Sequence, residues 1–150
     1  MALRKLIEAW PSALRITVGV FWLYFASQKW QGVDWMKDVI KATADANPIP
    51  GLHQLLEALV VPNWALFAAA QGAGETVAAV LLILGLATRW AAILGVLLAA
   101  NLALTVAFAV SDDGFRWLYY LALAASIQVA NSKAGPVALD RFRWVPAVLR

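Results

Sequence analysis

One carboxylic acid stands near the middle of a long apolar stretch, where an ionisable group is costly. Glu75 lies within the apolar segment 64–87. Insertion scales place the cost of an ionisable side chain at the centre of a membrane helix at about 2.5–3.5 kcal/mol. Gln71 lies one helical turn before Glu75 and on the same face. A carboxyl group beside such hydrogen-bond donors can exchange a proton, so Glu75 is the candidate catalytic proton donor and acceptor.

Two polar residues in the next apolar segment repeat this four-residue spacing. If the chain folds back at about Thr88, Glu75 and Asn101 are each thirteen residues from the turn, and Gln71 and Thr105 are each seventeen. At equal rise per residue, each pair lies level across the hairpin. The sequence therefore predicts a polar ladder facing the interior of a helix bundle, with its amide and hydroxyl groups as candidate substrate-binding groups.

Two cations in the first apolar segment are candidate partners of this ladder. If Trp30 and Trp64 mark the same membrane interface, Arg15 lies about 22 Å below it and Glu75 about 16 Å below it. An extended arginine covers such a difference, and its planar fork suits a carboxylate. We therefore predict Arg15 as the partner of Glu75. On the same arithmetic Lys29 lies about 15 Å above Glu75, too far for contact, so we expect it to reach outward or to line an outer entrance.

A purely structural role explains the same residues equally well. An ion pair of Arg15 and Glu75, backed by Asn101, fixes helix packing without performing chemistry. His53, the only histidine, is expected to be a solvated interfacial residue. The acids between residues 34 and 45 are interpreted as a solvated face, so no metal site is predicted. The chain has no cysteine, which excludes disulfides, thiolate nucleophiles and cysteine-ligated metal centres, and one histidine cannot supply a bis-histidine haem.

The elements that must position these residues are membrane helices. The 150 residues are 63% hydrophobic and only 14% charged, whereas soluble domains average about 45–50% apolar and about 25% charged. Lipid must therefore be the main solvent of the chain. We predict an all-α fold, a transmembrane four-helix bundle that forms a single domain over residues 1–150. Its four spans, each reaching or approaching the length needed to cross a bilayer, are about 12–30, 64–87, 90–110 and 115–130.

The distribution of lysine and arginine predicts the orientation. With four spans, both termini share a side with the short turn near residue 89. That side carries eight cations, Arg4, Lys5, Arg15, Arg89, Lys133, Arg141, Arg143 and Arg150, against four on the other, Lys29, Lys37, Lys41 and Arg116. Cytoplasmic loops carry the excess of lysine and arginine. We expect an integral protein of a prokaryotic-type plasma membrane with both termini cytoplasmic, and no basic pattern predicts binding to nucleic acid.

The outer loop, residues 31–63, has a helical pattern of its own. Apolar residues recur at helical spacing from Trp35 to Ile40 and again from Leu52 to Val60, with a break at Pro48 and Pro50. This pattern predicts two short amphipathic helices joined by a proline elbow. Such helices either lie flat on the membrane or cap the bundle.

Several short motifs, in this order and spacing, resemble the DoxX/DoxD-like family of small membrane proteins. The motifs are Leu14-Arg15, Gly19, Gln28-Lys29, Val61-Pro62-Asn63, Gly74-Glu75, Leu84-Gly85-Leu86, Thr88-Arg89, Asn101 and Leu139-Asp140. That family includes the small subunit of thiosulfate:quinone oxidoreductase. The resemblance implies a four-helix subunit of a membrane redox complex near a quinone pool. It implies neither thiosulfate oxidation by this chain nor a covalently bound cofactor.

Three functional hypotheses follow. In the first, the chain is the quinone-linked subunit of a redox complex, with Glu75, Arg15 and Asn101 shaping a quinone-headgroup or proton site. Gln71, Thr105 and Lys29, together with Asn101, are its candidate substrate-binding residues. Electrons then come from a partner protein, because no site for an electron carrier is visible in the sequence. The second hypothesis is a small transporter or permeation protein that uses the same ladder as a path. The third is a non-catalytic scaffold that binds partner subunits through the outer loop. A partner protein subunit or a homo-oligomer is expected.

Overall fold

The structure, a computed structural model, describes residues 2–141, and Arg143 and Arg150 of the charge count lie outside this range. Every regular element within the described range is helical. The elements are α1 (Ala2–Ser27), α2 (Met36–Asp45), α3 (Pro50–Leu55), the π-helical turn η1 (Leu56–Val60), α4 (Trp64–Leu84), α5 (Thr88–Leu104), α6 (Val106–Ala109), α7 (Asp113–Asn131) and the 3₁₀ turn η2 (Leu139–Arg141). The prediction of an all-α chain is confirmed.

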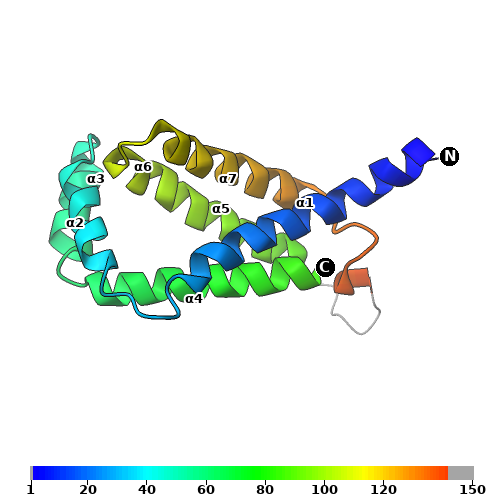
Figure 1. Cartoon of the computed structure of the whole chain (residues 1–150), viewed down its shortest axis with the longest axis horizontal. Helices are drawn as coiled ribbons and strands as arrows, with labels where there is room; N and C mark the ends of the chain where they lie inside the picture. The colour runs from blue at the N-terminus through cyan, green and yellow to red at the C-terminus, as the bar shows by residue number, and fades with distance from the viewer. Residues whose placement is uncertain (1, 142–150) are drawn as a thin grey trace.

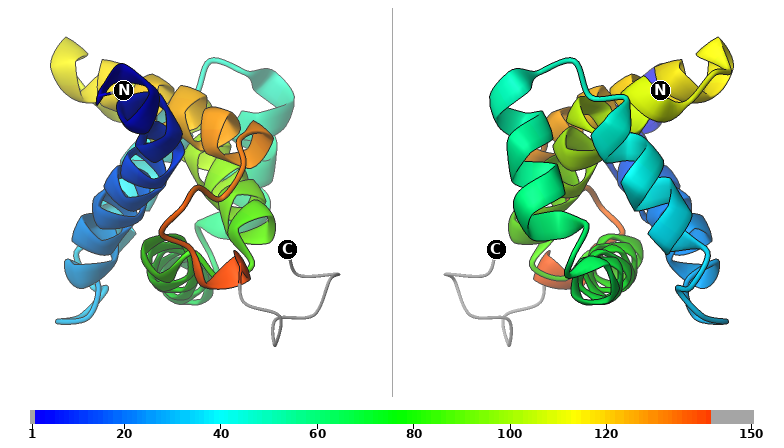
Figure 2. Two further views of the ribbon diagram at one scale, coloured as in Figure 1. Left: turned by 90° about the vertical axis from the view of Figure 1, so that its right-hand side faces the viewer. Right: turned by 90° about the vertical axis from the view of Figure 1, so that its left-hand side faces the viewer.

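The four long helices run side by side, and the loop helices stand at one end of them. Helix α1 packs on α4, α5 packs on α7, and α4 and α5 form a hairpin (Figure 1). Helices α2 and α3 lie across the far end of α4 and α5, at the opposite end from the N-terminus. The two end-on views in Figure 2 show the N-terminal end of α1 on one side and the loop helices on the other.

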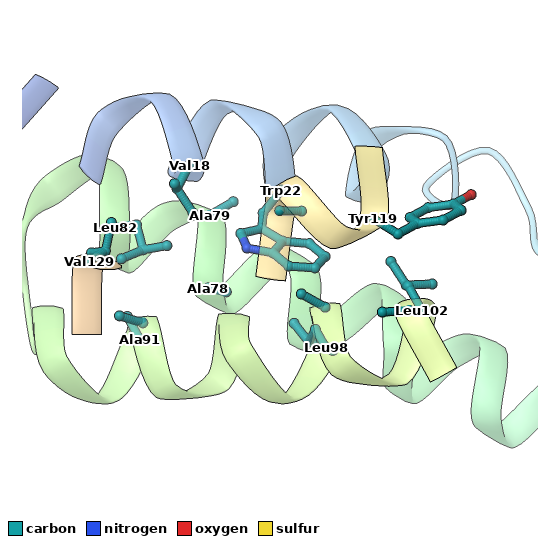
Figure 3. Packing of buried hydrophobic residues seen from close by; sticks show 14 of the residues in the cluster. Val18, Trp22, Ala78, Ala79, Leu82, Ala91, Leu98, Leu102, Tyr119 and Val129 are labelled. Atoms are coloured by element: carbon teal, nitrogen blue, oxygen red, sulfur yellow. The ribbon is translucent and has the colours of Figure 1, made fainter. Parts of the chain in front are cut away.

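The interior between the long helices is built from small residues around one large ring. Trp22 is fully buried, and the close-up in Figure 3 shows it between α1, α4, α5 and α7. Gly95 gives the ring its space, because a Cβ atom there would lie 3.0 Å from the indole Nε1 of Trp22. Gly19 allows α1 to approach α4 closely, since its Cβ would lie 3.0 Å from the backbone nitrogen of Ile83. Close packing through small side chains is typical of helices that associate in lipid.

Among the described residues, two helical stretches are long and apolar enough to cross a membrane. They are Trp64–Leu84, which is α4, and Thr88–Ala109, which is α5 with α6. A helix also covers each of the other two predicted segments, in α1 and α7.

The turn between α4 and α5 lies two residues earlier than the sequence predicts. Gly85 and Ala87 have positive φ angles of 67° and 48°, and Thr88 is already the first residue of α5. Moving the turn by two residues changes the residue of α5 that faces a given residue of α4 by four positions. As a result Gln71 lies level with Asn101, and the predicted pairing of Glu75 with Asn101 is wrong by one helical turn.

Helix α1 is displaced along α4 by about three turns from the predicted alignment. The indole Nε1 of Trp30 donates to Oγ1 of Thr76 at 3.1 Å. Thr76 follows Trp64 by twelve residues, which is about 18 Å along a helix. Trp30 and Trp64 therefore do not mark one level, and the first turns of α4 extend beyond the end of α1.

The outer loop forms two short helical segments, as predicted, and they cap the end of the bundle. Helix α2 packs on α4 and α6, and η1 packs on α2. Pro50 begins α3, where a proline lacks only an amide that would be unpaired anyway. The sequence does not predict that the second segment continues as a π-helical turn at Leu56–Val60. Such turns are rare and frequently accompany functional sites.

Candidate functional site

A continuous chain of hydrogen bonds runs from the turn that follows α1 to α5, buried at Glu75 and exposed at Asn101, so the predicted ladder faces the interior only in part. Nζ of Lys29 donates to Oε2 of Glu75 at 2.8 Å, and Nε2 of Gln71 donates to Oε1 of Glu75 at 2.9 Å. Nδ2 of Asn101 then donates to Oε1 of Gln71 at 3.3 Å. We call these four residues the polar chain. Each carboxylate oxygen of Glu75 thus has a donor, and the amide of Gln71 both donates and accepts.

The ion pair in this chain is shielded from solvent. The Glu75 side chain is fully buried and that of Lys29 is 7% exposed. Nζ of Lys29 also donates to the carbonyl of Phe25 at 3.2 Å and lies 5.9 Å from the ring centres of Phe25 and Trp35. Buried charges persist when they are paired and hydrogen-bonded, and these contacts meet that requirement. Gly72 leaves room for the lysine stem, because a Cβ there would lie 3.2 Å from Cδ of Lys29.

Tyr119 brings the fourth long helix to the same site. Its side chain extends from α7 and packs against Phe25, with ring centres 6.4 Å apart. The residue is 7% exposed, and its hydroxyl lies within electrostatic reach of the Glu75 carboxylate. The sequence pattern gives Tyr119 no place in the candidate site, because tyrosines near the ends of apolar segments are usually interfacial.

An apolar chamber of about 260 Å³ lies at the Asn101 end of the polar chain. The loop helices supply its roof, and α4, α5 and α6 supply its floor. Its lining residues are Met36, Val39, Ile40, Thr43, Leu52, Leu55, Leu56, Val60, Phe67, Gln71, Asn101, Leu102, Thr105 and Val106. The apolar stripes that the sequence assigns to the loop helices therefore face this chamber, and the polar groups of the ladder form part of its wall.

A break in the fifth helix shapes the floor of the chamber. Thr105 leaves the helical conformation, with φ −123° and ψ −78°, and separates α5 from α6. Its hydroxyl donates to the carbonyl of Asn101 at 2.5 Å. The carbonyl of Leu104, freed by the break, accepts from Nδ2 of Asn47 at 2.9 Å. Asn47, a buried residue of the proline elbow, thus fastens the roof to the floor. The sequence signal for it is the Asn-Pro step, which favours a local turn.

Thr43 adds a polar group to the roof. The residue is 4% exposed, and its hydroxyl has no hydrogen-bond partner among the described residues. A buried hydroxyl without a partner costs free energy, which a bound ligand with a suitable polar atom would recover. The chamber therefore combines apolar walls with few polar groups, as small-molecule sites generally do.

A polar depression of about 310 Å³ lies at the other end of the polar chain. It is lined by Gln28, Gln31, Gly32, Asp34 and Trp35 in the segment that follows α1. Trp35 separates this depression from the Lys29 ammonium group. Glu75 is thus placed between a polar surface depression and the apolar chamber.

The predicted pairing of Arg15 with Glu75 is wrong. The Arg15 side chain, 1% exposed, donates instead to backbone carbonyls at the far end of α4 and in the segment after α7. Nη1 donates to the carbonyl of Leu82 and, at 3.1 Å, to that of Ile83, while Nε donates to that of Ala134 at 3.1 Å and Nη2 to that of Val137. The displacement of α1 along α4 explains the error, because it brings Lys29 to the level of Glu75 and Arg15 to the helix end.

Asp140 completes this second polar cluster. Its carboxylate accepts from the backbone amides of Ala87 at 2.7 Å and Thr88 at 2.8 Å, and its own amide donates to the carbonyl of Gly85 at 2.9 Å. Arg15 thus meets the carbonyl end of α4 and Asp140 the amide end of α5, each at the helix end that its charge favours. We call Arg15, Gly85 and Asp140 the tail clamp. The sequence shows Asp140 only as part of a motif, without its capping role.

Of the six candidate site residues, five lie in or beside the polar chain. Glu75, Lys29, Gln71 and Asn101 form it, and Thr105 is bonded to its last member. Arg15 belongs to the tail clamp. Among the described residues, no group of three or more histidine, aspartate or glutamate side chains could hold a metal ion, and the solvated face of the acids between residues 34 and 45 stays a prediction.

Comparison with known proteins identifies a family. No curated protein and no solved structure matches the chain. The family model described as DoxX matches residues 11–109, which include α1 from Pro11 onward, the loop helices, α4, α5 and α6. The match covers the entire polar chain and every residue that lines the chamber. Together with the apolar helices α4 and α5, it identifies the chain as an integral membrane protein that belongs to the DoxX family.

Proposed function

We propose that the protein is the membrane subunit of a quinone-linked redox complex, and that it binds a quinone headgroup in the chamber beneath the loop helices. The observation that carries this proposal is the contact of an apolar chamber with a buried, hydrogen-bonded carboxylate through two amide side chains, Gln71 and Asn101. A quinone is an apolar ring with two carbonyl acceptors. The chamber offers a matching combination of apolar wall and hydrogen-bond donors.

The volume of the chamber favours a headgroup over a whole lipid. Sites for drug-sized ligands measure about 300–1,000 Å³, and this chamber of about 260 Å³ lies just below that range. A single substituted ring suits such a space, and an isoprenoid tail would have to leave it toward the lipid. In the same proposal α1 and α7 cross the bilayer together with α4 and α5, with both termini on the cytoplasmic side.

The polar chain supplies the proton chemistry in this proposal. Reduction of a quinone to a quinol takes up two electrons and two protons. Glu75, a carboxylate that accepts from Lys29 and Gln71, would first take up a proton from the outer depression past Lys29 and then release it toward the chamber. This cycle runs twice for each quinone, while Gln71 and Asn101 orient the groups and the partner protein supplies the two electrons. A positioned proton donor typically accelerates such a step by about 10²–10⁴-fold.

The electrons must come from outside the chain. The sequence contains no cysteine and one histidine, which leaves few ligands for an electron-carrying centre. A partner protein is therefore part of the proposal. Leu55 of α3 and Leu59 of η1, which are exposed apolar residues of the loop segments, are available for such a partner.

A permeation path receives less support from the structure. Between the polar chain and the tail clamp the long helices enclose a largely apolar core around Trp22 and Leu82 (Figure 3). The polar chain does not extend beyond Glu75 and Lys29 toward the tail clamp. It therefore links the outer depression to the chamber, and both lie at the same end of the bundle. A transporter would need polar groups through this core.

Binding of a quinone with a short alkyl tail to the purified protein tests the proposal. We expect the quinone to raise the midpoint of thermal unfolding in detergent. The Asn101→Leu variant removes an amide from the chamber wall. Glu75→Gln replaces the ionisable carboxyl group, which is the hydrogen-bond acceptor of Gln71, by an amide that cannot exchange a proton. Both should reduce or abolish the shift.

Two matched variants separate these effects from general damage. Asn131→Leu changes an exposed asparagine of α7, and Glu57→Gln changes an exposed carboxylate of η1. Both should keep the full shift. Equal unfolding midpoints with and without the quinone, in the unmodified protein, would contradict the proposal.

A further inference from the structure

We propose that a second site, at the end of the bundle opposite the chamber, binds a phosphodiester group. A cavity of about 650 Å³ lies there between the start of α5, the end of α7 and the segment that follows α7. Arg89 and Lys133 are the cations in its wall, and both are exposed. Nothing in the quinone proposal uses this cavity.

A buried hydroxyl at the start of α5 points to a ligand. Thr88 lines the cavity, is 3% exposed, and its Oγ1 has no hydrogen-bond partner among the described residues. Buried hydroxyl groups in proteins are nearly always paired, so an unpaired one at the wall of a cavity calls for an acceptor or donor from outside. Phosphate oxygens accept hydrogen bonds from hydroxyl groups, and charge strengthens such bonds.

The formal charges of the side chains around the cavity indicate which ligand charge they would balance. Arg89 and Lys133 contribute two positive charges to the wall, and Glu8 and Asp140 contribute two negative ones. The Asp140 carboxylate is bonded to two backbone amides and is attracted by the buried Arg15 guanidinium behind it. The lining side chains alone sum to zero, and the buried Arg15 guanidinium behind Asp140 brings the formal sum to +1, which balances a phosphodiester monoanion better than a phosphomonoester dianion.

The remaining wall and its place in the membrane favour a lipid as the source of that group. Ala130, Ala134 and Pro136 give part of the cavity an apolar lining, which suits the glycerol and the first carbons of an acyl chain. The cavity lies at the end that the count of lysine and arginine predicts to be cytoplasmic. Basic pockets between membrane helices on that side bind anionic headgroups.

Native mass spectrometry of the purified full chain, supported by thermal unfolding, tests the site. The probes are phosphatidylglycerol, a diacylglycerol with the same chains, and inorganic phosphate. We expect phosphatidylglycerol to bind and stabilise the protein and the diacylglycerol to do neither. Stabilisation by inorganic phosphate at least as strong as that by the lipid would retain the phosphate site but assign it to a soluble ligand. No stabilisation by either phosphate compound would overturn the proposal.

Three variants show where the lipid binds. Thr88→Val keeps the shape and charge of the residue and should weaken phosphatidylglycerol binding about tenfold, the effect of losing one charge-assisted hydrogen bond. The double variant Arg89→Gln/Lys133→Gln should weaken it further. The control, Lys37→Gln/Lys41→Gln, removes two exposed cations from α2 at the other end of the molecule and should leave binding unchanged. An equal loss in the control would show general attraction to an anionic lipid and overturn the proposal.

Discussion

At the scale of single residues, the position of α1 along α4 decides which cation pairs with the buried Glu75 carboxylate. Helical periodicity places Glu75 and Gln71 on one face, and their hydrogen bond confirms that prediction. Periodicity within a helix contains no information about how far a distant helix slides along it. The pairing of Glu75 with Lys29 instead of Arg15 therefore could not be derived from the sequence, although the polar residues themselves were recognised.

The Lys29–Glu75 pair gives a prediction at this scale. Lys29→Met alone leaves a fully buried carboxylate without its cation and should lower the free energy of unfolding by about 3–5 kcal/mol. The double variant Lys29→Met/Glu75→Leu removes both charges and should recover most of this loss. Reversible unfolding in mixed detergent measures both values. If the double variant is no more stable than Lys29→Met, the loss in the single variant does not come from the unpaired charge of Glu75, and the prediction is wrong.

At the scale of elements, the hairpin turn between α4 and α5 depends on one glycine. Gly85 has a φ of +67°, and a Cβ atom there would lie 2.8 Å from Cζ of Arg15 and from Cα of Ala138. The sequence predicts a turn near this position but places it two residues later. The Gly-X-Ala-Thr order leaves the first residue of α5 ambiguous, and the Asp140 carboxylate that fixes it comes from a segment more than fifty residues away.

Substitution of this glycine tests the role of the turn. Gly85→Ala should lower the free energy of unfolding by about 1–3 kcal/mol from the backbone conformation alone, and further from the clash with the Arg15 side chain. Gly51→Ala in α3 is the matched control, because no atom lies within 4 Å of its added Cβ and its φ is not positive. That variant should be neutral or slightly stabilising. Similar losses in both variants would be inconsistent with a special role for Gly85.

Hydrophobic patterning predicted the existence of most elements but not their irregularities. The four long helices and the two loop segments follow from apolar spacing and from the prolines at 48 and 50. The π-helical turn η1 and the break at Thr105 do not. The break at Thr105 is accompanied by a tertiary contact, the bond from Asn47 to the carbonyl of Leu104, that local sequence does not specify.

At the scale of the whole molecule, the two polar clusters lie at different levels of the bundle. Arg15 lies on α1 and Lys29 two residues past its end, and their separation of fourteen residues corresponds to about 21 Å of helical rise. The core around Trp22 separates the clusters, and the structure shows no residue that belongs to both.

This separation predicts additive energetics. The Asp140→Asn variant weakens the tail clamp and should lower stability, and Lys29→Met should lower it independently. Because sites this far apart without shared partners usually add within about 0.3–0.5 kcal/mol, the double variant should show the sum of the two changes. Chemical unfolding of the four proteins under one set of conditions measures the coupling. A coupling above about 1 kcal/mol would mean that the core transmits strain between the ends.

The displacement of α1 along α4 has a consequence for how this protein could diversify. Because α1 ends about three turns short of the start of α4, the insert that carries the loop helices closes the chamber at a level that α1 does not reach. Eight of the fourteen lining side chains come from that insert, residues 31–63. Exchanging it between homologues would therefore alter which molecule is accommodated while the bundle, with its carboxylate and lysine, keeps its own fold.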